Sequence, residues 1–595
     1  MATILPNGKT QFIDQNGRPL VAGKVFYYEP GTETFKDTYA DLAGTIVNEN
    51  PVTLDGRGQA AICGIGTYRQ VTKDKNGSTI WDEEVSEMSD GLAASDGASR
   101  VGFIQAGGGA VKRTAQNKMR EIWSVADFGA TSGSDVGIAL QRAHDAGESK
   151  VLVNFGQYKW DTPVTLLNAL KIVGEGYTEG ANAAAGTWCE VRQQNFTPLT
   201  FSGGNARGGG IDGVAFWETN HPSGAPGWTP AANDYLIKVL NCEGGVEIGD
   251  VLMARANRGI YCYNSGRLHV RKLRGQFFTA GIEIDRCLDI PAIDYVHAWP
   301  FFTSDSNIMA YQQANLDVIT TRRCDGVFLG NVFTLGSRSS IRMSSSSYGY
   351  TTKLYCNALY ADLGLYGLWV DSSASHSTGQ IANFTGQGER WGTGVGIDNG
   401  AAIRIDSNDC VFQVGSLHTQ AYWNSSIVLN GLNNEIDFGN LWFESDNQSN
   451  TNSPHIFMAN GVGTNRINVS GYIRSDGVNN PPMVNGSTNG NLGVGVYANR
   501  PAGATDEPRL YWGPGGATLA AVSPNAKSNL TLQGQGDGIV IAGNPMQIPR
   551  FSVSQLTPAL AAKFDACMVM VGDRSNRIAV SISTGWVWQD GTPVA

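Results

Sequence analysis

Two carboxylates, Glu283 and Asp285, stand two residues apart in the segment Ile282-Glu283-Ile284-Asp285. In an extended strand, side chains two residues apart share one face, and their bases lie about 6.6 Å apart at roughly 3.3 Å per residue. With side-chain reach, this separation spans the carboxylate spacings of retaining and inverting glycosidases, about 5–5.5 Å and about 6.5–9.5 Å. The pair therefore fits acid/base cleavage of a glycosidic bond, with the stereochemical outcome open.

A recurring apolar frame surrounds this pair. It consists of an apolar residue, any residue, a second apolar residue and any residue, followed by small or polar residues, and it returns mostly every 22 to 29 residues. A period-2 pattern that ends in a turn at this interval predicts the rungs of a parallel β-helix, in which each rung buries its inward side chains by stacking on the next. The first apolar positions are Ile237, Ile260, Ile282, Ile319, Ile341, Leu368, Ile403, Ile427 and Ile456.

Two other architectures fit this pattern less well. Leucine-rich repeats share the period, but the sequence has neither their Leu-x-x-Leu-x-Leu frame nor a helix in each repeat. An antiparallel sandwich would place hairpin signals between the segments and would not keep one phase. We therefore predict an all-β chain built on a parallel β-helix over residues 124–490.

The second and fourth positions of each rung point outward in this frame and carry most of its charge. Arg322 falls in phase with Asp285 on the next rung, nominally about 4.8 Å away, whereas Glu283 faces Thr320. A cation at that distance favours ionised Asp285, so we expect Glu283 to be the proton donor and Asp285 the nucleophile or base. The alternative is an ordinary ion pair between Asp285 and Arg322, with Glu283 solvated. The same outward stripe contains Arg342, Trp369 and Asp371.

Two intervals, from Ile282 to Ile319 and from Leu368 to Ile403, are 37 and 35 residues long and so exceed the 22 to 29 residues of the others. Insertions in solenoids form loops on one face, which is often the binding face. Their aromatic rings either anchor the loops or stack on sugars. We expect Asp371 with Glu389 to be the next carboxylate combination, and Asp305 to be a third possible partner. The candidate residues are His297, Trp299, Phe301 and Asp305 in the first insertion and Glu389 and Trp391 in the second.

Composition and charge exclude several classes of protein. The net charge is −10 and no block of five like charges occurs, so nucleic acid binding through a basic face has no support. No run approaches 18 apolar residues, so no membrane insertion is predicted, and the first residues lack the pattern of a secretory signal. The nine cysteines include no CxxC motif, so we expect most of them to be small buried hydrophobes, with no disulfide framework, metal site or cofactor.

The flanking regions differ from the repeat. Residues 1–95 form a separate β-rich unit punctuated by Asn-Gly, Pro-Gly and Asp-Gly turns. Residues 96–123 continue a Gly/Ala-rich linker into a short helical pattern, whose apolar stripe packs on its own domain or forms a three-helix neck. That stripe consists of Val111, Ala115, Met119 and Ile122.

Several segments resemble bacteriophage tailspikes, which are capsular polysaccharide depolymerases with a pectate-lyase-like right-handed parallel β-helix. The entry to the helix is similar over RTAQNKMRE (113–121) and SVADFGA (124–130), and its middle over CLDIP (287–291) and VHAWPF (296–301). Residues 23–32, 50–58 and 66–69 resemble a virion-anchoring domain, and residues 564–588 resemble a C-terminal segment of phage fibres.

This resemblance implies a homotrimer on the phage virion, assembled in the cytoplasm of the bacterial host and attached to a tail or baseplate protein through residues 1–95. It implies a catalytic β-helix that binds and hydrolyses a bacterial capsule or O-antigen, and a β-rich region, 491–595, for trimerisation or receptor binding. Two alternatives stay open. A polysaccharide lyase would need a base such as His297 or Tyr263 and a cation such as Arg322 or Arg342 for a uronate carboxylate, whereas an adhesin would bind without cleavage.

Overall fold

The computed structural model describes residues 9–86, 92–179, 185–446, 448–449, 453–459 and 464–476, together with separate short segments between residues 490 and 593. The chain separates into two compact units, Met1–Val496 with Leu510–Thr518, and Tyr497–Arg509 with Leu519–Ala595. Among the helices in the described ranges, none has the length and hydropathy needed to cross a membrane.

Residues 9–86 form a small β-rich fold. Its core contains Phe12, Val25, Tyr27, Leu54 and Tyr68. Val25 and Tyr27 are buried because side chains alternate between the two faces of β2. The main sheet is antiparallel, in the order β3 (Val52–Thr53), β2 (Lys24–Tyr28), β5 (Thr67–Lys73) and β6 (Thr79–Ser86), and β1 (Thr10–Gln11) pairs with β4 (Gln59–Ala60).

The helix predicted near residue 115 is short. It is α2 (Ala115–Met119), capped by Thr114, whose Oγ accepts a hydrogen bond from the backbone N–H of Asn117 at 3.1 Å. Val111 and Ile122 lie outside it, so the prediction of one four-residue helical stripe was wrong. The cause is that β8 (Arg113–Thr114) pairs with β7 (Gly102–Phe103) and so sets where the helix begins. A 3-10 turn, η1 (Gly97–Arg100), precedes this hairpin.

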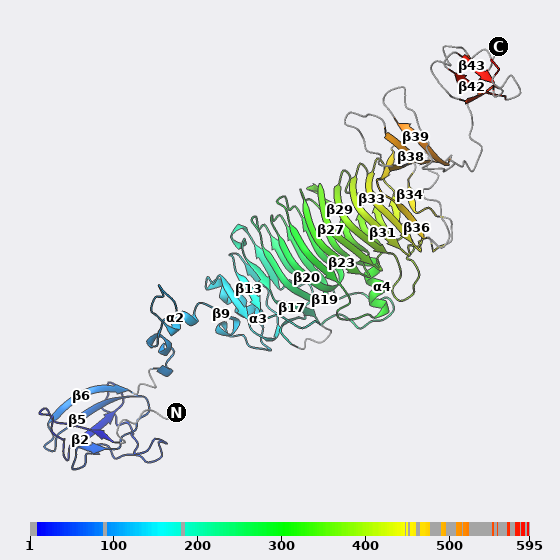
Figure 1. The fold of residues 1–595 in the computed structure, drawn as a ribbon. Helices are drawn as coiled ribbons and strands as arrows, with labels where there is room; N and C mark the ends of the chain where they lie inside the picture. Colours follow the sequence, from blue (N-terminus) through cyan, green and yellow to red (C-terminus); the bar gives the residue numbers. More distant parts are fainter. Residues whose placement is uncertain are drawn as a thin grey trace. The chain divides into compact units, whose positions relative to one another are not determined.

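A right-handed parallel β-helix follows, which confirms the predicted fold class (Figure 1). Each strand pairs in parallel with the equivalent strand of the next coil, and the coils have three sheets. The sheet that carries the recurring frame is called sheet A. It contains β12 (Val164–Leu166), β15 (Leu199–Ser202), β18 (Tyr235–Leu240), the last residues of β19 (Glu247–Tyr263) and β20 (His269–Asp285), β22 (Asp317–Thr321), β24 (Ser339–Met343), β28 (Tyr366–Val370), β30 (Ala401–Ile405), β32 (Ile427–Leu429) and β34 (Ile456–Met458).

The other two faces are sheets B and C. Sheet B begins with β10 (Lys150–Val153), β13 (Lys171–Gly174) and β16 (Gly210–Asp212), and sheet C with β11 (Gly156–Lys159), β14 (Thr187–Val191) and β17 (Val214–Glu218). From β19 onward, single long strands bend from sheet B into sheet C. They are β19, β20, β21 (Ala292–Ala298), β23 (Val327–Leu335), β27 (Lys353–Asp362), β29 (Thr378–Gln387), β31 (Val411–Gln420) and β33 (Glu435–Glu444), followed by β35 (Asn465–Val469) and β36 (Ile473–Asp476).

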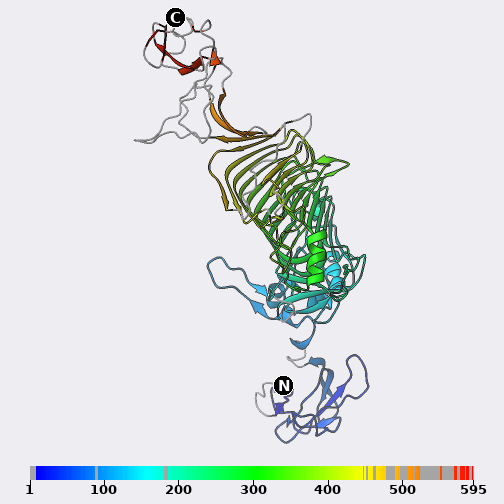
Figure 2. The same ribbon diagram turned by 90° about the vertical axis from the view of Figure 1, so that its right-hand side faces the viewer.

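Three segments are added to the regular coils. Helix α3 (Val136–Asp145) buries Leu140 in the same core as the first coils. Helix α4 (Ser306–Asn315) lies outside the stack beside β20 (Figure 2). A hairpin, β25 (Ser345–Ser346) with β26 (Gly349–Tyr350), follows β24. The remaining elements are β9 (Trp123–Ser124), η2 (Val125–Phe128), η3 (Gly204–Ala206), β37 (Gly490–Gly495), β38 (Glu507–Gly513), β39 (Gly516–Val522), β40 (Arg550–Phe551), β41 (Met568–Val571), β42 (Arg577–Ile582) and β43 (Gly585–Trp588).

The core follows the predicted phase, because the first and third positions of the sheet A rungs point inward. Ile282, Ile284 and Ile341 are fully buried. Where β31 and β33 bend from sheet B into sheet C, Gly415 and Gly439 let the coils approach: a Cβ there would lie 2.4 and 2.1 Å from a carbonyl oxygen of the preceding coil.

Most cysteines are buried, as predicted. Of the eight cysteines in the described residues, seven are buried and Cys63 is partly exposed. Cys242, Cys287 and Cys324 follow sheet A strands and Cys262 lies within the last residues of β19. All four are fully buried, and the Sγ atoms of Cys262 and Cys287 are 3.5 Å apart.

Asp446 makes the β-helix sensitive to pH. Its carboxylate is buried and accepts hydrogen bonds from Thr419, Ser426 and the N–H of Tyr422, but burial outweighs them and raises its pKa from 3.8 to about 6. Because the folded-state pKa is the higher one, its stabilising contribution is complete below about pH 4 and is lost as the pH rises through 6. Asp446→Asn should therefore flatten the fall in melting temperature between pH 4 and 7.

Melting curves at four pH values in this range test the effect, with Asp325→Asn at an exposed surface carboxylate as the matched control. Parallel curves for the wild-type protein and Asp446→Asn would contradict it.

Candidate functional site

The candidate site is the outer surface of sheet A between β18 and β30, called here the sheet A surface. It is polar because the second and fourth positions of each rung point outward, as predicted. One hollow on it has a volume of about 470 Å³. The hollow is lined by Arg342, Ser344, Trp369, Asp371, Ser372, Ser373 and Asp406.

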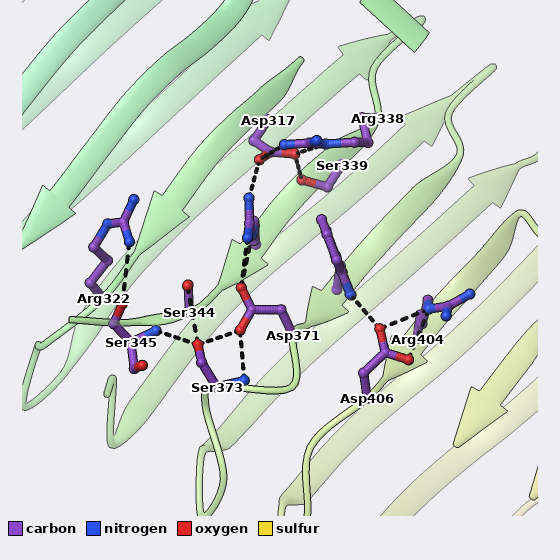
Figure 3. Close-up of polar contacts among 12 residues, drawn as sticks. Asp317, Arg322, Arg338, Ser339, Ser344, Ser345, Asp371, Ser373, Arg404 and Asp406 are labelled. Carbon is purple, nitrogen blue, oxygen red and sulfur yellow. Dashed lines mark hydrogen bonds and ion pairs between the residues drawn. The ribbon is translucent and has the colours of Figure 1, made fainter. Parts of the chain in front are cut away.

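Arg342 ties together two nearly buried carboxylates at this hollow. Its Nε and Nη2 donate to Asp371 Oδ2 at 3.0 and 2.8 Å, and its Nη1 donates to Asp317 Oδ2 at 2.9 Å (Figure 3). Burial alone would raise the pKa of Asp371, but hydrogen bonds from Ser373, Ser344 and Arg342 outweigh burial and lower it. Asp371 is therefore a fixed anion and is poorly suited to donate a proton.

The carboxylates of the neighbouring rungs also accept hydrogen bonds from other side chains of the protein. Asp406 accepts hydrogen bonds from Trp369 Nε1 at 2.8 Å and Arg404 Nε at 2.9 Å (Figure 3), and Asn430 Nδ2 donates to it at 2.7 Å. Asp317 accepts from Ser339 Oγ at 2.7 Å and from Arg338 Nε at 2.8 Å. Both oxygens of each carboxylate are thus occupied.

Glu283 has the cation that was predicted for Asp285. Arg322 Nε donates to Glu283 Oε1 at 2.9 Å, and the hydroxyl of Tyr235 donates to Oε2 at 2.7 Å. The predicted pairing of Arg322 with Asp285 is therefore wrong. Strand β22 ends at Thr321, so Arg322 leaves the alternation of the strand and its long side chain reaches back to Glu283.

Asp285 differs from the other carboxylates of this surface. It accepts hydrogen bonds from Ser346 Oγ at 2.8 Å and from the backbone N–H of Arg323 at 3.3 Å, both at Oδ1. Within the described residues, its Oδ2 has no hydrogen-bond partner, whereas both oxygens of Glu283, Asp317, Asp371 and Asp406 have one. Asp285 is 6% exposed and, of these five carboxylates, is the one that keeps an oxygen without a hydrogen-bond partner in the described residues.

The first insertion lies apart from this pair. It precedes β22, at the start of the sheet A strands, whereas Asp285 ends its strand. Asp305 caps α4 by accepting from the N–H groups of Asn307 and Ile308, which explains its position without substrate. Its candidate residues, His297 to Asp305, lie on β21 and in the segment between β21 and α4, so this insertion is not beside Glu283 and Asp285.

His297 belongs to an aromatic cluster on β21 in sheet C. Its ring centroid lies 5.9 Å from Trp299, 5.4 Å from Phe301 and 5.1 Å from Phe333. Burial lowers its pKa, and the charge of Arg274 lowers it further. Because sheet C is a different face of the helix, His297 and Trp299 are not brought to the sheet A surface.

The second insertion is held against α4. Gln313 Nε2 donates to the carbonyl of Glu389 at 3.0 Å, and the N–H of Trp391 donates to Gln313 Oε1 at 3.1 Å. Glu389 is thus at the start of the sheet A strands, and Asp371 follows the end of β28, so the two do not form the predicted combination. The charge of Glu389 acts on Asp362, whose pKa is raised first by burial and then by Glu389.

Sequence reasoning missed several residues of this surface. Asp317 stands two positions before the inward-pointing Ile319, so the alternation predicts an inward side chain and gave no signal for a residue of this surface. Ser346 had no sequence signal, because only the hairpin after β24 brings it to Asp285. In the described ranges, no group of three or more His, Cys, Asp or Glu side chains is arranged to hold a metal ion.

Comparisons with known proteins give similarity to solved structures only. No family model matches the sequence, and no curated protein matches it. The chain is similar to phage tailspikes. Tailspike protein 3 of bacteriophage CBA120 is 13% identical, with 74% of this chain and 77% of that chain covered and a TM-score of 0.35.

Glycoside hydrolases also show similarity. The catalytic domain of a GH87 α-1,3-glucanase in complex with nigerose is 13% identical, with 79% of this chain and 88% of that chain covered and a TM-score of 0.41. A family 28 exopolygalacturonase of Yersinia enterocolitica is 13% identical, with 74% and 86% covered and a TM-score of 0.32.

Proposed function

We propose that this chain is a phage tailspike whose sheet A surface binds a bacterial capsule or O-antigen and hydrolyses its glycosidic bonds. The observation that carries the proposal is the free Oδ2 of Asp285 beside Glu283, a carboxylate held by Arg322 and Tyr235. The segments that resemble tailspikes give the biological setting.

The hydrogen bonds support the two roles in the opposite order to the sequence-based prediction. Asp285 accepts at Oδ1 only, which leaves Oδ2 free to deliver a proton to the glycosidic oxygen as the bond to the anomeric carbon breaks. Glu283 stabilises the positive charge that develops on the sugar. Water then adds to the anomeric carbon, and its proton restores Asp285.

One assay tests the reaction. The protein is incubated with purified capsular and O-antigen polysaccharides, and both new reducing ends and ultraviolet absorbance at the unsaturated-uronate band are recorded. Hydrolysis gives reducing ends without absorbance. Absorbance would identify a lyase, and binding with neither signal would identify an adhesin, so either result overturns the proposed hydrolysis.

The contacts favour hydrolysis over β-elimination. Of the groups that a lyase was expected to use, His297 lies on sheet C, Arg322 is paired with Glu283, and Arg342 is paired with Asp317 and Asp371. Tyr263 is the one expected base that stays on the sheet A surface.

The assembly is also part of the proposal. Residues 1–95 attach to a tail or baseplate protein, 96–123 form a neck, 124–490 are catalytic, and 491–595 trimerise or bind the receptor in a virion protein assembled in the host cytoplasm. Val111, Met119 and Ile122 are 75, 72 and 65% exposed, and exposed apolar side chains that are close in sequence favour contact with other subunits.

We expect a sedimentation mass three times that of one chain. Deletion of residues 1–95 should leave a trimer that still cleaves polysaccharide, because the Gly/Ala-rich linker has few large apolar groups to couple the two parts. A monomeric mass would contradict the trimer.

A further inference from the structure

A row of four tyrosines crosses the sheet A surface beside the proposed catalytic pair. The ring centroids of Tyr235 and Tyr261 are 5.2 Å apart, those of Tyr261 and Tyr263 are 6.3 Å apart, and those of Tyr263 and Tyr348 are 6.2 Å apart. Tyr235 is buried at one end, Tyr261 and Tyr263 are partly exposed, and Tyr348 is 48% exposed at the other end. This set is called the tyrosine row.

The tyrosine row is in register with the carboxylates. In the parallel pairing of β19 with β20, Tyr261 is opposite Glu283 and Tyr263 is opposite Asp285. The hydroxyls of Tyr263 and Tyr348 are 3.1 Å apart, which fixes the exposed end of the row. Since aromatic faces stack on the apolar faces of sugar rings, a glycan on this row would lie along the strand direction, one rung from Asp285.

Two arginines with no carboxylate partner border the tyrosine row. The guanidinium of Arg258 lies 5.4 Å from the Tyr235 ring, and that of Arg286 lies 4.4 Å from the Tyr348 ring. Neither forms an ion pair with any described residue. By contrast, four other arginines of this surface, Arg322, Arg338, Arg342 and Arg404, are each paired with a carboxylate. A guanidinium with unused donors is suited to bind a carboxylate in bidentate geometry.

The backbone at Arg286 gives an independent indication. Its φ is +56°, and the equivalent turn residues of the two preceding coils, Asn241 and Asn264, have φ of +58° and +48°. Asn264 Nδ2 donates to Asn241 Oδ1 at 2.7 Å, so these two form an asparagine ladder. Asparagine tolerates the left-handed conformation, whereas arginine is strained there. Strain of this kind is typical of functional positions, where the side chain has a task that asparagine cannot perform.

We infer that the tyrosine row is a subsite for a sugar that bears a carboxylate, with Arg286 and Arg258 as its anion-binding residues. This inference rests on the proposed function and specifies its substrate as an acidic glycan. The tyrosine rings bind the sugar faces, and the two guanidinium groups bind carboxylates at the two ends of the row.

Carboxyl reduction tests this directly. The full-length protein is titrated with the capsular and O-antigen polysaccharides from the cleavage assay, and with the same polysaccharides after chemical reduction of each carboxylate to a primary alcohol. We expect the bound polysaccharide to contain a carboxylate and its reduced form to bind about ten- to a hundredfold more weakly, as for the loss of a charge-assisted hydrogen bond.

Substitution of the two arginines tests whether they bind the carboxylate. Arg286→Gln and Arg258→Gln should each weaken binding of the native polysaccharide by a similar factor and leave binding of the reduced one unchanged. Arg267→Gln is the matched control, because Arg267 also has a positive φ of +55° but is paired with Asp289. It should bind both forms as the wild-type protein does.

The outcomes separate the two proposals. If a neutral polysaccharide is bound and cleaved, or if the reduced polysaccharide binds as tightly as the native one, the acidic-sugar subsite is wrong and the depolymerase proposal stands. If Arg286→Gln and Arg258→Gln bind the native polysaccharide like the wild-type protein, the subsite lies elsewhere. If none of the polysaccharides is bound or cleaved, both proposals fail.

Discussion

Asp285→Asn should lower the turnover number for polysaccharide cleavage by about 10²–10⁴-fold and leave polysaccharide affinity nearly unchanged. The asparagine keeps the shape of the side chain and an oxygen that can accept from Ser346 and Arg323, but it has no acidic proton at the position of Oδ2. Reducing-end kinetics give the turnover number, and calorimetric titration gives the affinity.

The control for this variant is Asp294→Asn, an exposed carboxylate on sheet B that pairs with His269. It should cleave at the wild-type rate. If Asp285→Asn cleaves at the wild-type rate while Asp371→Asn or Asp406→Asn is inactive, the proton donor lies in the hollow beside Trp369 and the assignment of Asp285 is wrong.

Arg342→Met should destabilise the β-helix by about 3 kcal/mol, because it leaves two nearly buried carboxylates without their shared cation. The side chains of Asp317 and Asp371 are 7% and 9% exposed, and each keeps hydrogen-bond donors from other residues, so we place the effect at the low end of the range for broken buried pairs. Melting temperatures and denaturant unfolding measure this change in stability.

Arg323→Met is the matched control, because Arg323 pairs with the exposed Asp325 and its loss should cost less than about 1 kcal/mol. Adding Asp371→Asn to Arg342→Met should restore part of the lost stability, since it removes the charge left unpaired, whereas Asp317 keeps its ion pair with Arg338. Equal melting temperatures for Arg342→Met and Arg323→Met would show that the carboxylates do not depend on Arg342.

The rungs of sheet A could be predicted because burial alone fixes their phase. Ile282 and Ile284 must point into the core, so Glu283 must point outward, whatever the rest of the chain does. Sheets B and C gave no comparable signal, because their long strands bend at residues such as Gly415 and interrupt the alternation.

The charge pairing of the site could not be predicted for a different reason. Register fixes where a Cα lies, but Arg322 is long enough to bypass the facing Asp285 and reach Glu283. Ser346 reaches Asp285 from 61 residues away along the chain, through a hairpin that the rung pattern does not contain. The site depends on such side-chain reach and on turns, and neither leaves a period in the sequence.

The column of buried thiols allows the opening of single coils to be timed. Cys262, Cys287 and Cys324 lie on successive coils with no exposed surface, so a thiol reagent can reach each one only when that coil separates from its neighbour. Because coils contact only adjacent coils, the labelling rate of each cysteine measures a local opening equilibrium within the stack. Comparing the labelling rates of the three cysteines would therefore give the order in which the coils separate, without any engineered probe.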